Sequence, residues 1–484
     1  MSGIPVLPPR HGYPEVTMAV HTRHPAGAPP SAPSRESTGH LLLRGYAVLL
    51  LFIALATSFW FNLLGAAGLG VLVGVTTIVS IVLWVVLRPP IVWRLLPWLP
   101  LTYVVWAAAS VLWSAWPDAT ALTWALLAAT TVQALFLASV LTWRELVAAI
   151  SSALTWIVGL SLAFELWVSL IVHGPVLPNF LLWDGELVTE LYWSRDNLFD
   201  GGRIQGIVGN AHLLAIACLL ALIVYAIRIA SSPQRRAWFI GWSVVSAFLL
   251  WRSSSGTVWL ALAAVAVVLA TMLLMRTTRA PGERTKYYVA YAGLGILGGI
   301  VLWLWRDDLL AILGKSSDLT GRGGIWQAVA ERAAEHPWLG WGFSTPWLPW
   351  VPEFDGWIIV NDLTVFHAHN VWLDAWMQLG IVGVALLGLS YLAVIWRAWF
   401  FAIDRPRWDL RADRPYQALT LLPTLVMTVL LVQGLAESRP LGEWGWLFLV
   451  LFAHKLAQSP HVGEGPAEQS LAIERGEALR RMPR

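Results

Sequence analysis

The chain has 484 residues, of which 57% are hydrophobic and 13% are charged, and its mean hydropathy is +0.63. A soluble globular protein carries about 25% charged residues, so this composition excludes that class and indicates a polytopic membrane protein. The single cysteine, Cys218, excludes a disulfide within one chain and a metal site made of cysteines.

Both ends of the chain differ in composition from its centre. Residues 1–40 are rich in Pro, Ser, Gly and His and contain no apolar run, which predicts a disordered cytoplasmic tail rather than a cleaved signal peptide. Residues 459–484 are similarly polar and are expected to form a second cytoplasmic tail. The membrane domain is therefore expected over residues 41–458.

Between these tails lie twelve apolar segments, most of which reach the roughly 20 residues that a helix needs to cross a bilayer. In chain order they span Leu41–Leu64, Ala66–Leu87, Leu99–Trp116, Ala119–Leu141, Val147–Val172, Ile207–Ala230, Ala237–Trp251, Thr257–Met275, Tyr287–Trp305, Val371–Trp396, Ala418–Leu435 and Leu441–Gln458. We therefore predict an all-α polytopic membrane protein with about 12 transmembrane helices.

The basic residues predict how these helices are oriented. With both termini in the cytoplasm, 24 of the 32 lysines and arginines lie in cytoplasmic segments, as the positive-inside rule requires. Two outer segments are then much longer than the others, residues 174–206 after the fifth helix and residues 306–370 between helices nine and ten. Such long loops are uncommon unless they function. Because both contain Trp and few charges for their length, we expect them to lie on the outer membrane surface.

The second outer loop contains a helical pattern. Gly321–Trp326 is followed by Ala328–His336, and Pro337 stops the run. We predict an interfacial helix with Asp318 or Thr320 as its cap and Arg322 in its first turn.

This loop ends at His369 and Asn370, which are followed by Gly380 and Gly383 along the next apolar segment. A histidine at the mouth of a membrane helix is costly to keep dry and is usually retained for function. Its ordinary pKa lies near neutrality, so it can take a proton from a hydroxyl. The two glycines are expected to let another helix or a lipid chain approach closely.

The region from Thr320 to Gly383 resembles the O-antigen ligase family of bacterial membrane glycosyltransferases. The matching residues are Gly321-Arg322, Ile325-Trp326, Pro337-Trp338-Leu339-Gly340-Trp341-Gly342 and His369-Asn370-x9-Gly380-x-x-Gly383, and upstream Arg203-x-x-Gly206-x-x-x-Asn210. Two departures leave the subfamily open: Val384 stands where the motif often has Thr, and Arg252-Ser253-Ser254-Ser255-Gly256 replaces a Ser-Arg-Gly run.

The resemblance implies a GT-C-like fold with a large outer loop between helices 9 and 10. It also implies transfer of a glycan from a polyprenyl-diphosphate donor to an acceptor hydroxyl, on the outer side of a bacterial inner (plasma) membrane. The acceptor is a glycan, a lipid or a protein, membrane lipids surround the chain, and no nucleic acid is involved. His369 would be the general base, which contributes about 10²–10⁴ in rate.

The leaving diphosphate requires fixed cations, and arginine binds phosphate oxygens with a planar fork. Four outer arginines are candidates for this role: Arg322 and Arg203 on the family motifs, Arg252 in the run that replaces Ser-Arg-Gly, and Arg439 in the last outer turn. Because the sequence lacks an Asp-x-Asp pair and a ligand cluster at metal spacing, no metal or other cofactor is expected.

Supporting residues are expected beside His369. Asn370 would cap the tenth helix and orient the imidazole, and Asp374 would either hold that imidazole or pair with an arginine. Glu437 in the last outer turn is a candidate for binding sugar hydroxyls. Glu165, within the fifth helix, is either a functional carboxylate or a structural one, and His367 is expected to be structural.

Three other functions remain open. A glycan polymerase of the same superfamily differs in its acceptor, which the sequence does not specify, and a cell-wall glycan elongase is a remoter enzyme. A secondary transporter would show repeated halves and charges at the membrane midplane. The sequence has no half-to-half similarity, and its candidate site residues lie at one face.

Overall fold

The computed structural model of the protein describes residues 38–181, 188–278, 281–305, 322–360, 362–404 and 416–458. The chain forms two compact units, residues 1–43 and residues 44–484. The described part of the first unit is the start of α1, and the other elements belong to the second unit. The two predicted tails lie outside the described residues, except for residues 38–40, which begin α1.

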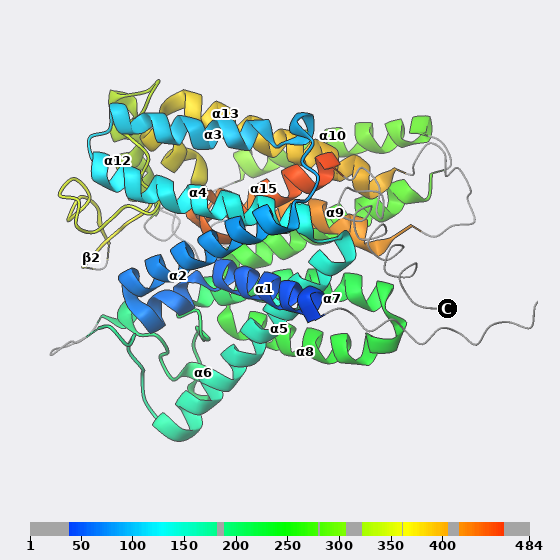
Figure 1. Ribbon diagram of the computed structural model, residues 1–484, viewed down its shortest axis with the longest axis horizontal. Helices are drawn as coiled ribbons and strands as arrows, with labels where there is room; N and C mark the ends of the chain where they lie inside the picture. The colour runs from blue at the N-terminus through cyan, green and yellow to red at the C-terminus, as the bar shows by residue number, and fades with distance from the viewer. Residues whose placement is uncertain are drawn as a thin grey trace, which may run out of the picture. The chain divides into compact units, whose positions relative to one another are not determined.

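The described chain is mostly helical, which confirms the all-α class (Figure 1). Seven of its helices are long and apolar enough to cross a membrane. They are α1 (Thr38–Leu55), α2 (Thr57–Leu87), α4 (Pro117–Val140), α5 (Trp143–Trp167, extended to Val172 by a π-helical turn), α7 (Ala211–Ser231), α9 (Gly256–Arg276) and α13 (Val371–Ile403). The count of twelve spans stays a prediction.

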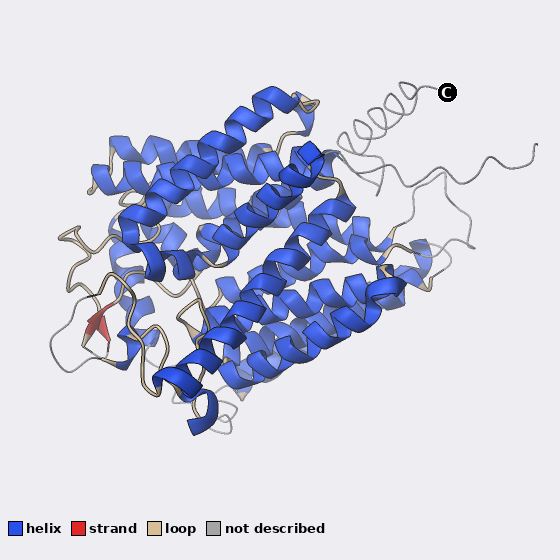
Figure 2. Cartoon of the chain, turned by 60° about the horizontal axis from the view of Figure 1, so that its bottom comes forward, coloured by secondary structure: helices blue, strands red, loops and turns tan. Residues whose placement is uncertain are grey.

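The remaining helices are shorter or less apolar. They are α3 (Trp98–Ala109), α6 (Asn197–Asp200), α8 (Arg236–Ser253), α10 (Thr285–Leu304), α12 (Arg322–Glu335), α14 (Leu422–Gly434) and α15 (Glu443–Gln458). Two short antiparallel strands, β1 (Ile359–Val360) and β2 (Leu363–Thr364), pair within the loop before α13. Figure 2 shows these strands and most of the described loops gathered at one end of the helices.

The first predicted helix, Leu41–Leu64, differs from the structure. The helix is interrupted at Ala56, and the Thr57 hydroxyl donates to the carbonyls of Ile53 and Ala54. A second helix, α2, then runs to Leu87 with a kink at Gly65. Gly65 has φ +72°, a backbone conformation that glycine adopts without a steric penalty. Both deviations depend on local backbone geometry, which an unbroken apolar run does not reveal.

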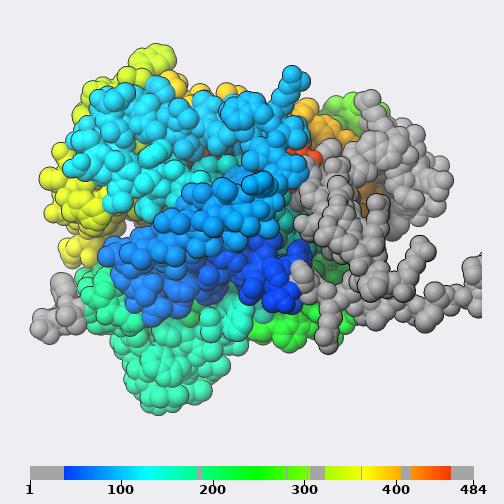
Figure 3. Space-filling model, viewed as in Figure 1, coloured from blue at the N-terminus to red at the C-terminus, as the bar shows by residue number. Residues whose placement is uncertain are grey.

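The predicted interfacial helix is present as α12. It begins at Arg322, and the proposed caps Asp318 and Thr320 lie outside the described residues. Ile325, Val329 and Ala333 follow one another at four-residue spacing and are buried in a cluster with Trp347 and Phe354. This apolar cluster also includes Trp116 and Ala119 at the start of α4 and Met377 of α13, so it fixes the second outer loop to the helices. Figure 3 shows this loop at one end of them.

This outer loop docks into a kink of α13 at Gly380, which has φ +65°. The helical hydrogen bonds lost at the kink are replaced by loop backbone: Trp341 N–H donates to Met377 O (2.9 Å), and Ile381 N–H donates to Pro337 O (2.8 Å). A Cβ at Gly380 would clash with the Trp338 carbonyl. The predicted close approach at Gly380 is therefore real, but the partner is the protein's own loop rather than a helix or a lipid.

Each long loop is also held by one buried carboxylate. Glu165 in α5 accepts hydrogen bonds from the backbone N–H groups of Gln205 (3.0 Å) and Gly206 (2.6 Å) and from the Ser194 hydroxyl (3.1 Å). These partners all belong to the first loop. The structure thus favours the structural alternative for Glu165.

The two ends of α13 are chemically different. His369 and Asn370 precede its start, whereas its last turns meet basic residues: Arg276 donates to Ala402 O (2.7 Å), and Arg284 forms an ion pair with Asp404. At 1.5 Å per residue, 33 residues span about 50 Å. The candidate site and this basic end are therefore far apart, as the predicted orientation requires, although Arg405 lies outside the described residues.

Candidate active site

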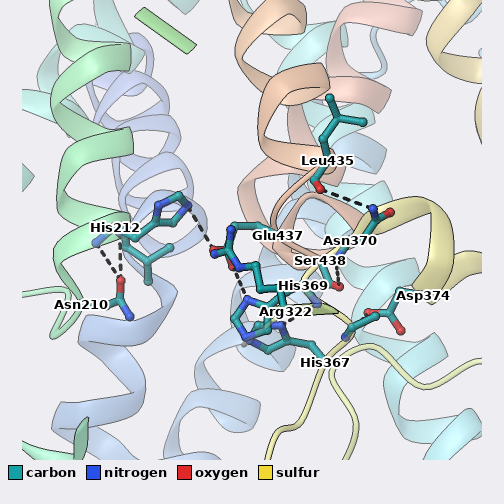
Figure 4. A network of polar contacts seen from close by, with 12 residues as sticks. Asn210, His212, Arg322, His367, His369, Asn370, Asp374, Leu435, Glu437 and Ser438 are labelled. Atoms are coloured by element: carbon teal, nitrogen blue, oxygen red, sulfur yellow. Dashed lines mark hydrogen bonds and ion pairs between the residues drawn. The ribbon is translucent and has the colours of Figure 1, made fainter. Parts of the chain in front are cut away.

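Glu437 lies at the centre of a cluster of cationic and imidazole side chains (Figure 4). Its Oε1 accepts from Nη2 of Arg322 at 2.8 Å, and its Oε2 lies 3.3 Å from Nδ1 of His369. The carboxylate is only 10% exposed, whereas Arg322 and His369 keep about a quarter of their side-chain surface. The cluster therefore opens toward solvent on the side of the arginine and the imidazole.

The start of α13 explains the position of His369. Asn370 caps this helix, as predicted, with its side-chain oxygen accepting from the N–H groups of Trp372 (2.9 Å) and Leu373 (3.2 Å). The Asn370 backbone N–H donates to the Ser438 hydroxyl at 3.2 Å, next to Glu437. His369 has φ +51°, a strained conformation for a residue with a side chain. Asn370 thus joins the helix start to the turn that carries Glu437.

The surroundings keep Glu437 ionised. Burial raises the pKa of Glu437, but the contact with His369 and the charges of the neighbouring imidazoles outweigh burial, so its pKa is held well below the usual range. At neutral pH this carboxylate can therefore orient its cationic and N–H partners without taking a proton from them.

His367 lies beside His369, with the ring centroids 3.9 Å apart and the ring planes tilted by 57°. Its Nδ1 accepts from the backbone N–H of His369 at 3.3 Å. Desolvation, together with the charge of His369, lowers the pKa of His367 to about 3. A neutral ring that accepts from the backbone supports the loop conformation, which agrees with the structural role expected for His367.

His212 also faces Glu437, and the sequence alone did not reveal this contact. It lies in the first turn of α7, which Asn210 caps, and its Nε2 is 3.8 Å from Oε1 of Glu437. Its Nδ1 is 2.8 Å from the Ser255 hydroxyl. The available sequence signal was a histidine two residues after the Arg203-to-Asn210 motif, at the start of a membrane helix.

Arg203 and Arg252 have other neighbours. Arg203 donates to Ser253 O at 2.9 Å, and Arg252 donates to Asn197 O at 2.6 Å. Burial, together with the charge of Arg195, lowers the pKa of Arg203. Both arginines thus join the first outer loop to the turn between α8 and α9. The same turn contains Ser255, which reaches Glu437 through His212.

Two further candidates make structural contacts. Arg439 donates to the Ser58 hydroxyl (3.0 Å) and pairs with Glu443 (3.3 Å). Asp374 was expected to pair with an imidazole or an arginine, and the structure shows other partners. Its carboxylate is almost fully buried and accepts hydrogen bonds from Trp347 Nε1 (3.0 Å) and Gln378 Nε2 (2.6 Å). Asp374 therefore holds the second outer loop on α13, as Glu165 holds the first.

His367, His369 and Glu437 place three potential metal-ligand atoms within 4.8 Å of one another. Two histidines and a carboxylate form a set that zinc accepts. However, Arg322 already contacts the carboxylate at 2.8 Å, and its fixed positive charge opposes a second cation. The residues therefore fit a metal poorly, and metal independence stays a prediction.

Comparison with known proteins adds the family. Residues 241–388 match the model of the O-antigen ligase family. A region of the chain is therefore similar to the O-antigen ligase family. This confirms the resemblance, and the matched stretch includes Arg252, Arg322 and His369, whereas His212 and Glu437 lie outside it. With seven apolar helices that can span a bilayer, the chain is a multi-pass membrane protein.

Two curated proteins are similar to parts of the chain. The exopolysaccharide production protein ExoQ of Rhizobium meliloti is 28% identical over 151 residues, which cover 30% of this chain and 35% of ExoQ. The thiol:disulfide interchange protein DsbD of Photorhabdus laumondii is 26% identical over 240 residues, 50% of this chain and 33% of DsbD. The matches thus span about a third of each relative. Disulfide exchange within one chain needs two cysteines, and this chain has only Cys218.

Proposed function

We propose that this protein transfers a glycan from a polyprenyl-diphosphate donor to an acceptor hydroxyl at the outer face of the bacterial plasma membrane, with both termini in the cytoplasm. The observation that carries the proposal is the placement of Arg322 and His369 on opposite oxygens of one buried carboxylate. Arg322, as the cation for the leaving group, and His369, as the base for the acceptor, thereby lie close together. Both belong to the stretch that matches the O-antigen ligase family.

His369 would act as the base. Nδ1 of His369 lies 3.3 Å from Glu437 Oε2 without forming a hydrogen bond there, and a small rotation of the ring would direct Nδ1–H to that oxygen and leave Nε2 to accept a proton. The acceptor oxygen then attacks the anomeric carbon, the bond from that carbon to the diphosphate oxygen breaks, and the hydroxyl proton moves to Nε2. Glu437 would stabilise the imidazolium that forms, so its role is orientation rather than the sugar binding first considered.

Arg322 would bind the departing diphosphate. It is the first residue of α12, where unpaired backbone N–H groups also favour an anion. Arg203, Arg252 and Arg439 are retained as further cations for the donor, although their present contacts are with loop carbonyls, Ser58 and Glu443. Since the arginines supply the positive charge, the reaction would need no metal or other cofactor.

A glycan polymerase is the second candidate. The similar protein ExoQ is named for exopolysaccharide production, which favours an acceptor that is itself a growing glycan. Ligase and polymerase would use the same donor chemistry, and they differ in the hydroxyl presented to His369.

The test is glycan transfer by the purified full chain with a polyprenyl-diphosphate-linked glycan. Arg322→Ala and Arg322→Lys should both lose transfer while remaining folded, because lysine keeps the charge but lacks the two-pronged donor. The matched control is Arg332→Lys on the same helix, which should keep transfer. The guanidinium of Arg332 lies 3.9 Å from the centre of the Trp357 ring, away from Glu437. Full activity of Arg322→Lys would count against the diphosphate role.

A further inference from the structure

The second imidazole facing Glu437 has no assigned role. His212 is 13% exposed, and its Nε2 lacks a hydrogen-bond partner among the described residues. The side-chain amide of Gln433, fully buried one turn before Glu437, lies beside this imidazole and likewise forms no hydrogen bond of good geometry. An unpaired buried polar group costs about 1–3 kcal/mol, so groups in this state beside an active carboxylate suggest a second arrangement in which they are used.

The proposed function itself requires such an arrangement. Arg322 is the closest cation to Oε1 of Glu437, at 2.8 Å. If Arg322 turns to the donor diphosphate, Oε1 loses that partner in a site where only 10% of the carboxylate is exposed. Leaving a buried carboxylate uncompensated is strongly unfavourable, so donor binding would be opposed unless another group replaces the guanidinium.

His212 is placed to be that group. Its Nε2 lies 3.8 Å from the same oxygen, Oε1, that accepts from Arg322. The Ser255 hydroxyl, 2.8 Å from Nδ1, can donate to that nitrogen and thereby keep the hydrogen on Nε2. A movement of about 1 Å would then bring Nε2–H to hydrogen-bond distance. In Figure 4 the imidazole and the guanidinium reach Glu437 from different elements, so one can leave while the other stays.

Resting on the proposed function, we infer that His212 is a positioning residue that takes over Glu437 Oε1 when the donor diphosphate draws Arg322 away. Oε2 keeps its contact with His369 throughout, so the base remains oriented after the arginine has moved. No proton is transferred in this exchange. The ion pair between Arg322 and Glu437 is replaced by an ion pair between Arg322 and the diphosphate and by a hydrogen bond from the neutral His212 ring to Glu437. Donor binding and orientation of the base are thereby coupled.

The test is a double-mutant cycle on the full chain in detergent, with binding of a glycan-free polyprenyl diphosphate and transfer both measured. His212→Ala should weaken donor binding and slow transfer by about ten- to a hundredfold, the usual range for a residue that orients a functional group. His212→Gln, which retains an N–H donor, should recover most of both. In the Arg322→Ala background, His212→Ala should no longer affect binding, because no arginine has to be released.

The outcomes separate this inference from the proposed function. Weaker but measurable binding in Arg322→Ala alone supports the diphosphate role whatever His212 does. Equal effects of His212→Ala in both backgrounds, or no recovery in His212→Gln when it folds like the starting protein, would overturn the exchange. His173→Ala, which changes an exposed histidine outside the cluster, is the matched control and should bind and transfer normally.

Discussion

Nδ1 of His369 lies 3.3 Å from Oε2 of Glu437, although one residue precedes α13 and the other follows α14. A carboxylate beside one imidazole nitrogen favours the tautomer with the hydrogen on that nitrogen, and the second nitrogen is then left to act as the base of the proposed reaction. The contact depends on Asn370, which caps α13 and bonds Ser438 beside Glu437. The fold of the membrane domain therefore brings these two side chains together.

Asp374 is expected to contribute to stability rather than to chemistry. Asp374→Ala leaves Trp347 Nε1 and the Gln378 amide without their buried acceptor, which should lower the free energy of unfolding by roughly 2–4 kcal/mol. The apparent melting temperature in detergent measures this loss. Asp355→Ala, an exposed acid in the same loop, should change it little. Equal melting temperatures for the two variants would show that Asp374 does not hold the loop.

Part of this architecture was predictable from the sequence, and the features that were not predicted have physical reasons. Apolar runs located the helices, and the His369-Asn370 pair located the start of α13, because burial and capping act locally. The break at Ala56 was missed because it interrupts no apolar run. His212 was missed because its approach to Glu437 depends on how α7 packs near α14, between residues distant in the sequence.

The kink at Gly380 gives a sharp test of the docking of the second outer loop. Gly380→Ala adds a Cβ against the Trp338 carbonyl at a residue with φ +65°, so we expect a loss of roughly 2–4 kcal/mol in stability. Gly388→Ala in the same helix is the control, since its Cβ would meet the Trp372 ring at an ordinary 3.8 Å. Limited proteolysis of the loop should increase only in Gly380→Ala, and a protected loop in that variant would contradict the docking.

His367 should make stability depend on pH. Its pKa falls from 6.5 to about 3 in the folded protein, so between these values the unfolded chain binds a proton that the folded chain does not. Stability should therefore fall as pH drops through this window, by at most about 2 kcal/mol at pH 5. His367→Gln should flatten the dependence of melting temperature on pH, and His173→Gln should not. The depressed pKa of Glu437 acts in the same direction but below its ordinary value of 4.5. An unchanged slope in His367→Gln would refute this assignment.

Metal removal tests the role of the arginines. Because Arg322 already contacts Glu437, we expect transfer to survive treatment with a chelator. Added zinc should have little effect, since the charge of Arg322 opposes a second cation at His367, His369 and Glu437. Loss of activity with the chelator and its recovery with a divalent cation would instead assign these three residues to a catalytic metal.

The most direct test of the proposed reaction is the single-turnover rate of glycan transfer in His369→Ala. Because the imidazole acts only as the hydroxyl attacks, the rate should fall by about 10²–10⁴ while affinity for the polyprenyl-diphosphate donor stays near that of the starting protein. His367→Ala, the neighbouring histidine, should reduce the rate much less. A near-normal rate in His369→Ala, or equal losses in the two variants, would contradict the assignment of His369 as the base.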